Sequence, residues 1–358
     1  MSATDDRRWL EMAARIAGPF LGTTGAAPTV GVAIVRPAER VLVGRAVTPR
    51  GGDGDAVRLT LDEAGEAARG ATLYATLAPT GDATTAAIAA SGITRLVAGV
   101  AEPDHQMADA AARRLHEAGV ALVITDNAEC RRLHAGYLSR ATRKRPFVTA
   151  RLAVSADSMV AGNGRSAFDL FGEAAGRWNE MQRALADAVL VGWGTASADD
   201  ALLEVDLPGL EDRTPLRLVV AGQKTHAPRM RLLARAPEHP VAVIAIPEKK
   251  LELPEGIGII AVPGFKGRPD PLRALEALAS RGVQNLFIET GPTLLAAFLA
   301  AGAIDRFHLL RSETVVGQGG IPATPRGTIE ARLAAGGFSL VDHRLLDADN
   351  LRTFERSA

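Results

Sequence analysis

The chain has 358 residues, equal numbers of basic (41 Lys and Arg) and acidic (41 Asp and Glu) side chains, and a single cysteine, Cys130. This length predicts two domains, the charge balance excludes an overall basic field for nucleic acid, and one cysteine excludes an intrachain disulfide. No apolar run reaches transmembrane length, and the charged N-terminal residues argue against a signal peptide. We therefore expect a cytoplasmic protein.

In the first part of the chain, strand-like runs alternate with helical patterns. The predicted strands are 30–35, 41–47, 71–77, 94–100 and 120–124, and the predicted helices are 56–69, 83–91, 106–118 and 128–140. Such alternation predicts α/β layers. Residues 141–146 are polar and basic and end in Pro146, which predicts a domain boundary. Their charge could serve phosphate binding, but a solvated linker is the favoured interpretation.

The second part repeats the alternation. The predicted strands are 147–154, 188–191, 216–221, 241–246, 257–262, 285–289 and 306–311, and a hairpin is predicted from 338–345 and 351–355 around a turn at 347–350. These patterns predict a mainly parallel sheet finished by an antiparallel pair. No Gly-x-Gly-x-x-Gly follows a strand, so the usual dinucleotide fingerprint is absent.

Two of these strands end in residues suited to chemistry. The strand at 188–191 leads through Gly194 and Thr195 to Asp199 and Asp200, and the strand at 285–289 ends at Glu289. Open α/β sheets bind ligands at the carboxyl ends of their strands, so the two ends predict one cleft and an enzyme.

The turn after Glu289 favours a bound phosphate. Gly291 allows close approach of the backbone, Pro292 suits the first helical position, and the amides that follow lie at the positive end of a helix. An ordinary strand-to-helix turn is the alternative.

At these segments the chain resembles the bifunctional riboflavin-biosynthesis deaminase/reductase (RibD) family. The matching reductase segments are 145–157, 181–192, 194–200, 207–220 and 289–306, and the matching deaminase segments are 27–35 and 65–79. The resemblance implies an α/β fold with a cytidine-deaminase-like three-layer domain (1–143) followed by a dihydrofolate-reductase-like reductase domain (146–358).

The deaminase half departs from the family. A zinc deaminase needs one His and two Cys on the metal and a Glu for proton transfer. The His-Ala-Glu of the family is Gly54-Asp55-Ala56 here, and its Glu-Pro-Cys is Ala78-Pro79-Thr80. Asp53, Asp55 and Asp82 could replace ligands, but acidic residues in Gly-rich turns are usually turn formers. We expect no metal and no deaminase activity.

The resemblance also implies the reductase site and an NADPH cofactor. From their positions at strand ends we expect catalysis to involve Asp199, Asp200 and Glu289, with Asp199 in the cofactor site and Asp200 as a support or proton-relay residue, although adjacent carboxylates also often cap a turn. The resemblance assigns substrate binding to Arg151, Ser166, Arg183, Leu203 and Glu289. The implied cofactor contacts are Ala153, Phe168, Thr195, Asp199, Gly222, Gly291, Pro292, Thr293, Leu294, Leu295, Ala296 and Ala297. Lys224, Arg229 and Arg231 are either contacts of the cofactor 2′-phosphate or a solvated basic turn.

The implied reaction is NADPH-dependent reduction of the ribosyl group of 5-amino-6-(5-phosphoribosylamino)uracil in a homo-oligomer, with a dimer expected. Three departures bear on the substrate: Arg151 replaces the usual Lys, Asp206 replaces an Arg expected to anchor phosphate, and Gly176 replaces another Arg beside Arg177. Reversing charge near a phosphate weakens its binding. A reductase of an altered or non-phosphorylated substrate and a non-catalytic nucleotide-binding paralogue therefore remain alternatives.

Overall fold

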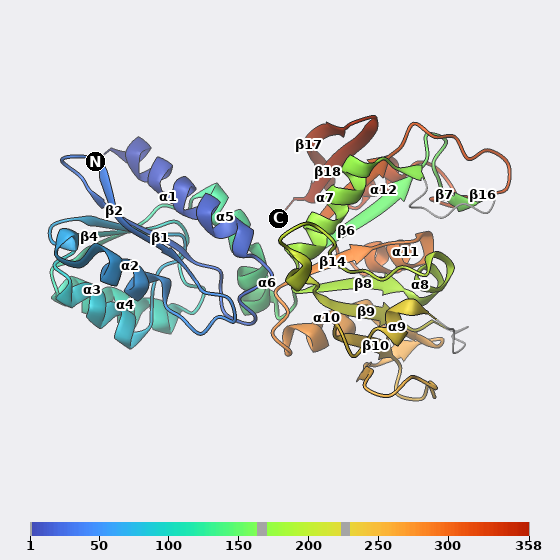
Figure 1. Ribbon diagram of the computed structural model, residues 1–358, viewed down its shortest axis with the longest axis horizontal. Coiled ribbons are helices and arrows are strands. Elements are labelled where there is room, and N and C mark those ends of the chain that lie inside the picture. The colour runs from blue at the N-terminus through green and yellow to red at the C-terminus, as the bar shows by residue number, and fades with distance from the viewer. Residues whose placement is uncertain (1, 163–169, 223–229, 358) are drawn as a thin grey trace. The chain divides into compact units, whose positions relative to one another are not determined.

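The computed structural model describes residues 2–162, 170–222 and 230–357. The chain divides into two compact units, Met1–Lys144 and Arg145–Ala358, and each is treated by itself (Figure 1). None of the helices in the described ranges has both the length and the apolar composition needed to cross a bilayer.

The first unit is built on a five-stranded sheet of order β2-β1-β3-β4-β5. Strand β1 pairs antiparallel with β2 and β3, whereas β3, β4 and β5 are parallel. The strands are β1 (Gly31–Arg36), β2 (Val41–Val47), β3 (Thr72–Ala75), β4 (Arg95–Ala98) and β5 (Ala121–Ile124). The helices are α1 (Ala3–Ala17), α2 (Ala56–Ala64), α3 (Asp82–Ala90), α4 (His105–Glu117), α5 (Ala128–Leu133) and α6 (Ala135–Arg143).

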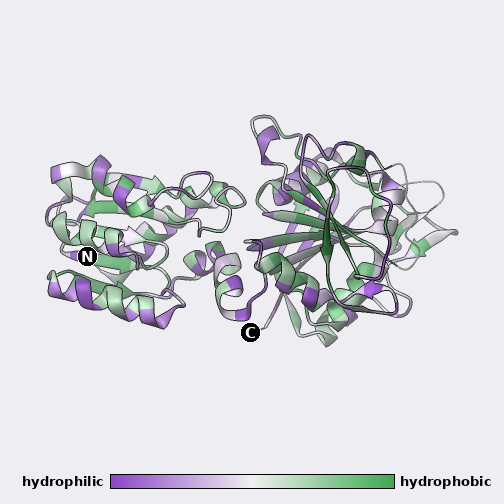
Figure 2. Cartoon of the chain, turned by 90° about the horizontal axis from the view of Figure 1, so that it is seen from below, coloured by the Kyte–Doolittle hydropathy of each residue, from purple (hydrophilic) through white to green (hydrophobic). Residues whose placement is uncertain are grey.

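Both faces of this sheet are buried, because alternate residues of β1 enter two different cores. Val32 and Ile34 pack with residues of α2, α3 and α4, whereas Ala33 and Val35 pack with residues of α1 and α5. The unit therefore has three layers, as predicted. Figure 2 shows that the central strands of both units are predominantly hydrophobic.

Helix α1 was not predicted, because its charged residues mask a narrow apolar stripe. Asp6 is buried within it and accepts hydrogen bonds from Tyr74 (2.9 Å) and from both terminal nitrogens of Arg95 (2.7 and 2.8 Å). Asp6, one of the charged N-terminal residues that argued against a signal peptide, thus forms a buried ion pair that fixes α1 to the sheet.

The second unit is built on a nine-stranded sheet of order β11-β10-β9-β8-β14-β6-β15-β18-β17. Its strands are β6 (Phe147–Val154), β8 (Ala188–Gly192), β9 (Leu216–Val220), β10 (Val241–Ala245), β11 (Gly258–Ala261), β14 (Asn285–Glu289), β15 (Arg306–Arg311), β17 (Phe338–Leu346) and β18 (Asp349–Arg356). Two short pairs lie outside it, β7 (Met159–Gly162) with β16 (Gly320–Pro322) and β12 (Gly264–Phe265) with β13 (Arg268–Pro269). The helices are α7 (Glu173–Ala184), α8 (Trp193–Asp199), α9 (Arg231–Ala234), α10 (Pro271–Ala279), α11 (Pro292–Ala300) and α12 (Ile329–Ala335).

The predicted sheet type is confirmed. Strands β11 to β15 are parallel along the sheet, and β15, β18 and β17 are antiparallel. Strands β8, β9, β14 and β6 therefore end at one edge, where loops and helices follow them.

Two local predictions were wrong. The hairpin turn occupies only Asp347 and Ala348, because β18 already begins at Asp349. The predicted linker is also not simply solvated. Helix α6 continues to Arg143, and Arg145 is largely buried in an ion pair with Asp305 (2.7 Å) at the start of the second unit.

Candidate active site

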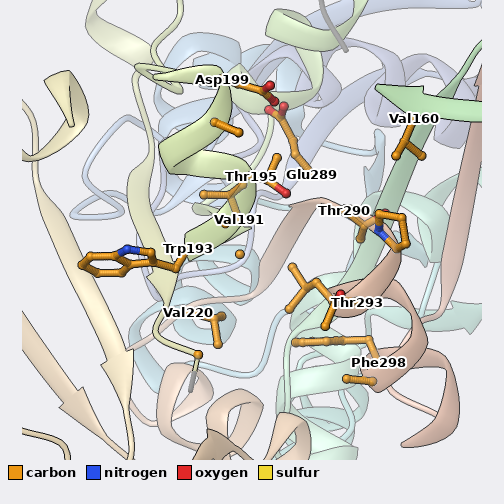
Figure 3. Close-up of a pocket in the computed structure, with 18 of the residues that line it drawn as sticks. Val160, Val191, Trp193, Thr195, Asp199, Val220, Glu289, Thr290, Thr293 and Phe298 are labelled. Atoms are coloured by element: carbon orange, nitrogen blue, oxygen red, sulfur yellow. The ribbon is translucent and has the colours of Figure 1, made fainter. Parts of the chain in front are cut away.

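A pocket of about 510 Å³ opens at the carboxyl edge of the second sheet. Its walls come from the ends of β6, β8, β9 and β14, from the helices α8 and α11, and from the hairpin β12–β13. Figure 3 shows Asp199 and Glu289 directing their carboxylates toward one another, with Thr195 close below them. Apolar side chains such as Val191, Val220 and Phe298 form much of the remaining lining.

Glu289 is the centre of a buried ionic cluster. It is the register partner of Arg151 on the neighbouring strand, and their side chains meet at 2.7 Å. Arg183 donates to both carboxylate oxygens (2.5 and 3.1 Å), and Asn179 donates to one of them (3.3 Å). Asn179 also accepts a hydrogen bond from Arg151 at 3.0 Å. Asn179 and Arg183 are four residues apart on α7, so both face the end of β14.

The cluster keeps Glu289 ionised. Burial alone opposes its charge, but Arg183 and Arg151 outweigh burial, so the pKa of Glu289 lies below its usual value. Burial also lowers the pKa of Arg151, while the negative charges of Glu289 and Asp199 oppose that shift. The pocket therefore contains a carboxylate that is fixed in position and already neutralised by arginines.

His308 lies behind Arg151, as its register partner on the other side, in β15. Its Nδ1 shares a hydrogen bond with Thr353 Oγ1 (3.0 Å), and its ring packs edge-on against Trp178 (5.0 Å between centroids). Burial lowers the pKa of His308 to about 3, so the ring is neutral at physiological pH. It supports the cluster without adding charge.

Helix α11 begins at the pocket wall, as the Gly-Pro turn predicted. Gly291 caps it and Pro292 occupies its first position. A Cβ on Gly291 would lie 2.8 Å from Thr195 Oγ1, which is too close for an ordinary contact. The amides of Thr293 and Leu294, in the first turn, have no carbonyl acceptor within the helix, so they offer donors to an anion.

The structure brings most of the expected cofactor residues to this pocket. Its lining includes Ala153, Thr195, Asp199, Gly222, Gly291, Pro292, Thr293, Leu294 and Ala297. Two are not brought there: Leu295 is buried in the core, and Ala296 is exposed on the outer face of α11. Phe168 lies outside the described residues.

Some of the expected catalytic and substrate-binding residues also line the pocket, and others do not. Arg151, Leu203, Asp199 and Glu289 line the pocket. Arg183 stands behind Glu289, and Ser166 lies outside the described residues. Asp200 is not among the lining residues; it is a left-handed helix cap whose carboxylate binds the backbone amide and the side chain of Arg231 (2.8 Å each).

This geometry gives no support to a proton-relay role for Asp200. It also shows that the side chain of Arg231 forms an ion pair with Asp200. Lys224 and Arg229 lie outside the described residues. Asp206 is exposed, and its backbone amide donates to Glu180 (2.7 Å); Arg177 pairs with Glu173 on the surface of α7.

Two residues of the site were not expected from the sequence. Asn179 has no motif around it, and only its four-residue spacing from Arg183 could have indicated a shared face. Arg268 lines the pocket from the hairpin β12–β13, which is too short to give a strand signal.

The first unit also contains a pocket, of about 360 Å³, around Gly54, Asp55 and Thr80. Asp55 is engaged as the cap of α2, accepting from the amide of Val57 (2.9 Å). Within the described ranges, no three His, Cys, Asp or Glu side chains are grouped so that they could share a metal ion. The donor set present here does not fit a zinc site.

The sequence is similar to known proteins of one family over most of its length. Residues 146–347 match the model of the RibD C-terminal domain. The chain is 29% identical to RibD of Escherichia coli K12 over 333 residues, covering 87% of this chain and 89% of that protein. It is 33% identical to RibD of Mycobacterium tuberculosis H37Rv over 297 residues, covering 80% and 78%.

Two solved structures have the same fold as this protein over nearly its whole length. Acinetobacter baumannii RibD (form 1) superposes with a TM-score of 0.85 at 26% identity and covers 100% of both chains. A deaminase/reductase from Thermotoga maritima has the same fold, with a TM-score of 0.85 at 22% identity and 99% coverage of both chains. These structures combine a deaminase domain with a dihydrofolate-reductase-like domain, and the two units described above have that architecture. The chain belongs to the RibD family.

Proposed function

We propose that this protein catalyses the NADPH-dependent reduction of 5-amino-6-(5-phosphoribosylamino)uracil to its ribitylamino product, a step of riboflavin biosynthesis. The observation that carries the proposal is the pocket in which Glu289, Asp199 and the first turn of α11 meet. Membership of the RibD family supports the reaction type.

The pocket fits a dinucleotide. The amides at the start of α11 and the close approach permitted by Gly291 suit a phosphate, and the apolar walls suit a nicotinamide ring. NADPH would supply the hydride when bound. The residues proposed to hold it are Ala153, Phe168, Thr195, Asp199, Gly222 and the segment 291–297.

The chain itself would bind and orient the reacting sugar. Glu289 is held by Arg151, Arg183 and Asn179, so it presents a fixed negative charge to the reacting sugar without moving. The buried wall formed by Leu203 and Ala153 would exclude water from the same region. Ser166 is a further proposed substrate contact, whereas Asp200 is proposed only as a support for the loop.

A second candidate is a reductase whose substrate lacks the phosphate. The observation that favours it is the charge at the substrate end of the pocket, where Arg151 and Arg183 already neutralise Glu289. Asp206 adds a carboxylate where the family resemblance implies an arginine. Oxidation of NADPH should be followed with the phosphoribosylaminouracil and with its dephosphorylated analogue in parallel. Preference for the first supports our proposal, preference for the analogue supports the second candidate, and oxidation with neither rejects both.

We also propose that the first unit has lost deaminase activity, because its pocket has Gly54 and Thr80 where a zinc deaminase has a His and a Cys on the metal. Metal analysis and a deamination assay test this directly. About one tightly bound zinc per chain, together with turnover, would reject it.

A dimer is proposed on different grounds. Strand β17 ends the nine-stranded sheet, and Leu340, Val341 and Leu345 on it are 52%, 52% and 67% exposed. An exposed edge strand of this length offers unpaired backbone groups and these three apolar side chains to another strand. Sedimentation of the full chain as a monomer at micromolar concentration would reject the dimer.

A further inference from the structure

The hairpin β12–β13 is rigidly built next to the pocket. Its two turn residues, Lys266 and Gly267, have φ values of 51° and 72°, which is the mirror-image turn that matches the twist of a two-residue hairpin. A Cβ on Gly264 would lie 2.1 Å from the carbonyl oxygen of Arg268 and 2.6 Å from Ile246 Cγ2. Only glycine allows this approach, so the backbone of Arg268 is held against the end of β10.

Two basic residues are among the described residues that line the pocket, and Arg268 differs from the other, Arg151. Arg151 is buried and tied to Glu289, whereas Arg268 is exposed. Within the ranges that the structure describes, no carboxylate forms an ion pair with Arg268. Its guanidinium is therefore a cation in the pocket wall whose charge is not neutralised by a described neighbour.

The position of Arg268 in the sheet order indicates which part of a ligand it would meet. The hairpin packs at the end of β10, and β9 and β8 lie between β10 and β14, which carries Glu289. Three strand spacings of about 4.8 Å separate β10 from β14 by roughly 14 Å. One end of the pocket thus has the carboxylates of Glu289 and Asp199, and the opposite end has a cation.

We propose that Arg268 forms a phosphate-binding subsite for the 2′-phosphate on the adenosine end of the cofactor and thereby selects NADPH over NADH. The inference rests on the proposed function. The two cofactors differ only in that phosphate, and a guanidinium binds a phosphate dianion through paired, charge-assisted hydrogen bonds. A phosphate at the opposite end would meet Glu289 and Asp199. Arg231, an earlier candidate for this contact, is engaged by Asp200.

Binding of two nucleotides to the full chain tests the subsite without any turnover. The probes are 2′,5′-ADP and 5′-AMP, which differ only in the 2′-phosphate, and dissociation constants are measured by titration calorimetry. In Arg268→Gln the constant for 2′,5′-ADP should rise on the order of tenfold to a hundredfold, while that for 5′-AMP stays unchanged. Arg268→Lys should recover part of the loss. The matched control is Lys250→Gln, which removes one exposed charge of the same unit outside the pocket lining.

Other outcomes overturn the assignment. An unchanged constant for 2′,5′-ADP in Arg268→Gln, or an equal rise for both nucleotides, rejects 2′-phosphate recognition by Arg268. An equal effect of Lys250→Gln would show general attraction rather than a subsite. If the wild-type chain binds neither NADPH nor 2′,5′-ADP, the proposed cofactor falls and this inference falls with it. Binding by wild type with no effect of Arg268→Gln rejects the inference alone.

Discussion

Replacing Glu289 by Gln should destabilise the second unit strongly, although the two side chains have nearly the same shape. The carboxylate accepts contacts from Arg151 (2.7 Å), Arg183 (2.5 and 3.1 Å) and Asn179 (3.3 Å), and it is 4% exposed. The variant removes the negative charge of Glu289 from beside two buried guanidinium groups. Removing one partner of a buried ion pair costs about 3–5 kcal/mol in free energy of unfolding.

Urea and thermal unfolding of the full chain measure this cost. For a unit of this size, about 3–5 kcal/mol corresponds to a fall in Tm of roughly 6–20 °C for the transition of the second unit. Asp200→Asn is the matched control, because it breaks a carboxylate–arginine pair of similar length (2.8 Å) that is exposed. Exposed pairs contribute about 1 kcal/mol at most, so its transition should move little.

A small effect of Glu289→Gln would refute this reasoning. If its free energy of unfolding falls by no more than that of Asp200→Asn, the buried arginines do not depend on the carboxylate. The cluster would then be a binding surface assembled only when a ligand is present, rather than a prefixed part of the fold.

Three further predictions concern the cofactor turn, the substrate phosphate and a buried histidine. Gly291→Val should abolish NADPH binding in a folded chain, because its Cβ would already lie 2.8 Å from Thr195 Oγ1. The control Gly258→Val, whose Cβ would make only an ordinary 3.7 Å contact on a strand, should bind NADPH normally. If Gly291→Val and the control bind NADPH with equal affinity, the turn is not part of the cofactor site. Asp206→Arg should strengthen binding of the phosphorylated substrate by about 1–3 kcal/mol in calorimetry and leave the dephosphorylated analogue unchanged, whereas equal responses would make Asp206 a plain surface residue. The pKa of His308 is about 3 in the folded protein and 6.5 in the unfolded chain, so the unfolded state takes up the proton first and stability falls as pH drops from 6.5 toward 3. Between pH 7 and pH 5 the His308→Gln variant should lose about 2 kcal/mol less stability than wild type in urea titrations, and parallel curves would contradict this.

The sheet and its functional edge could be predicted from the sequence because they depend on local patterns. Buried parallel strands appear as short apolar runs, and β6, β14 and β15 have the predicted bounds. The Gly-Pro turn gave the start of α11 for the same reason, since capping and the first helical position are properties of neighbouring residues.

The parts that were missed depend on contacts between residues far apart in the chain. Asn179 belongs to the cluster because α7 packs against the ends of β6 and β14, which no short window of sequence shows. The sequence left a support and a proton-relay role open for Asp200, and the contact of its side chain with Arg231, 31 residues away, could not be seen in a local pattern. Arg268 reaches the pocket from a hairpin of only two paired residues on each strand.

The ion pair between Arg145 and Asp305 determines where the second unit can be cut from the first. Asp305 receives both terminal nitrogens of Arg145 (2.8 and 2.7 Å) and the backbone amide of Val148 (2.8 Å). A fragment beginning at Pro146 would keep the whole of β6 but remove both guanidinium donors from this buried carboxylate. The second unit therefore begins structurally at Arg145, two residues before its first strand, and proteolytic or genetic dissection of the two units should preserve Arg145.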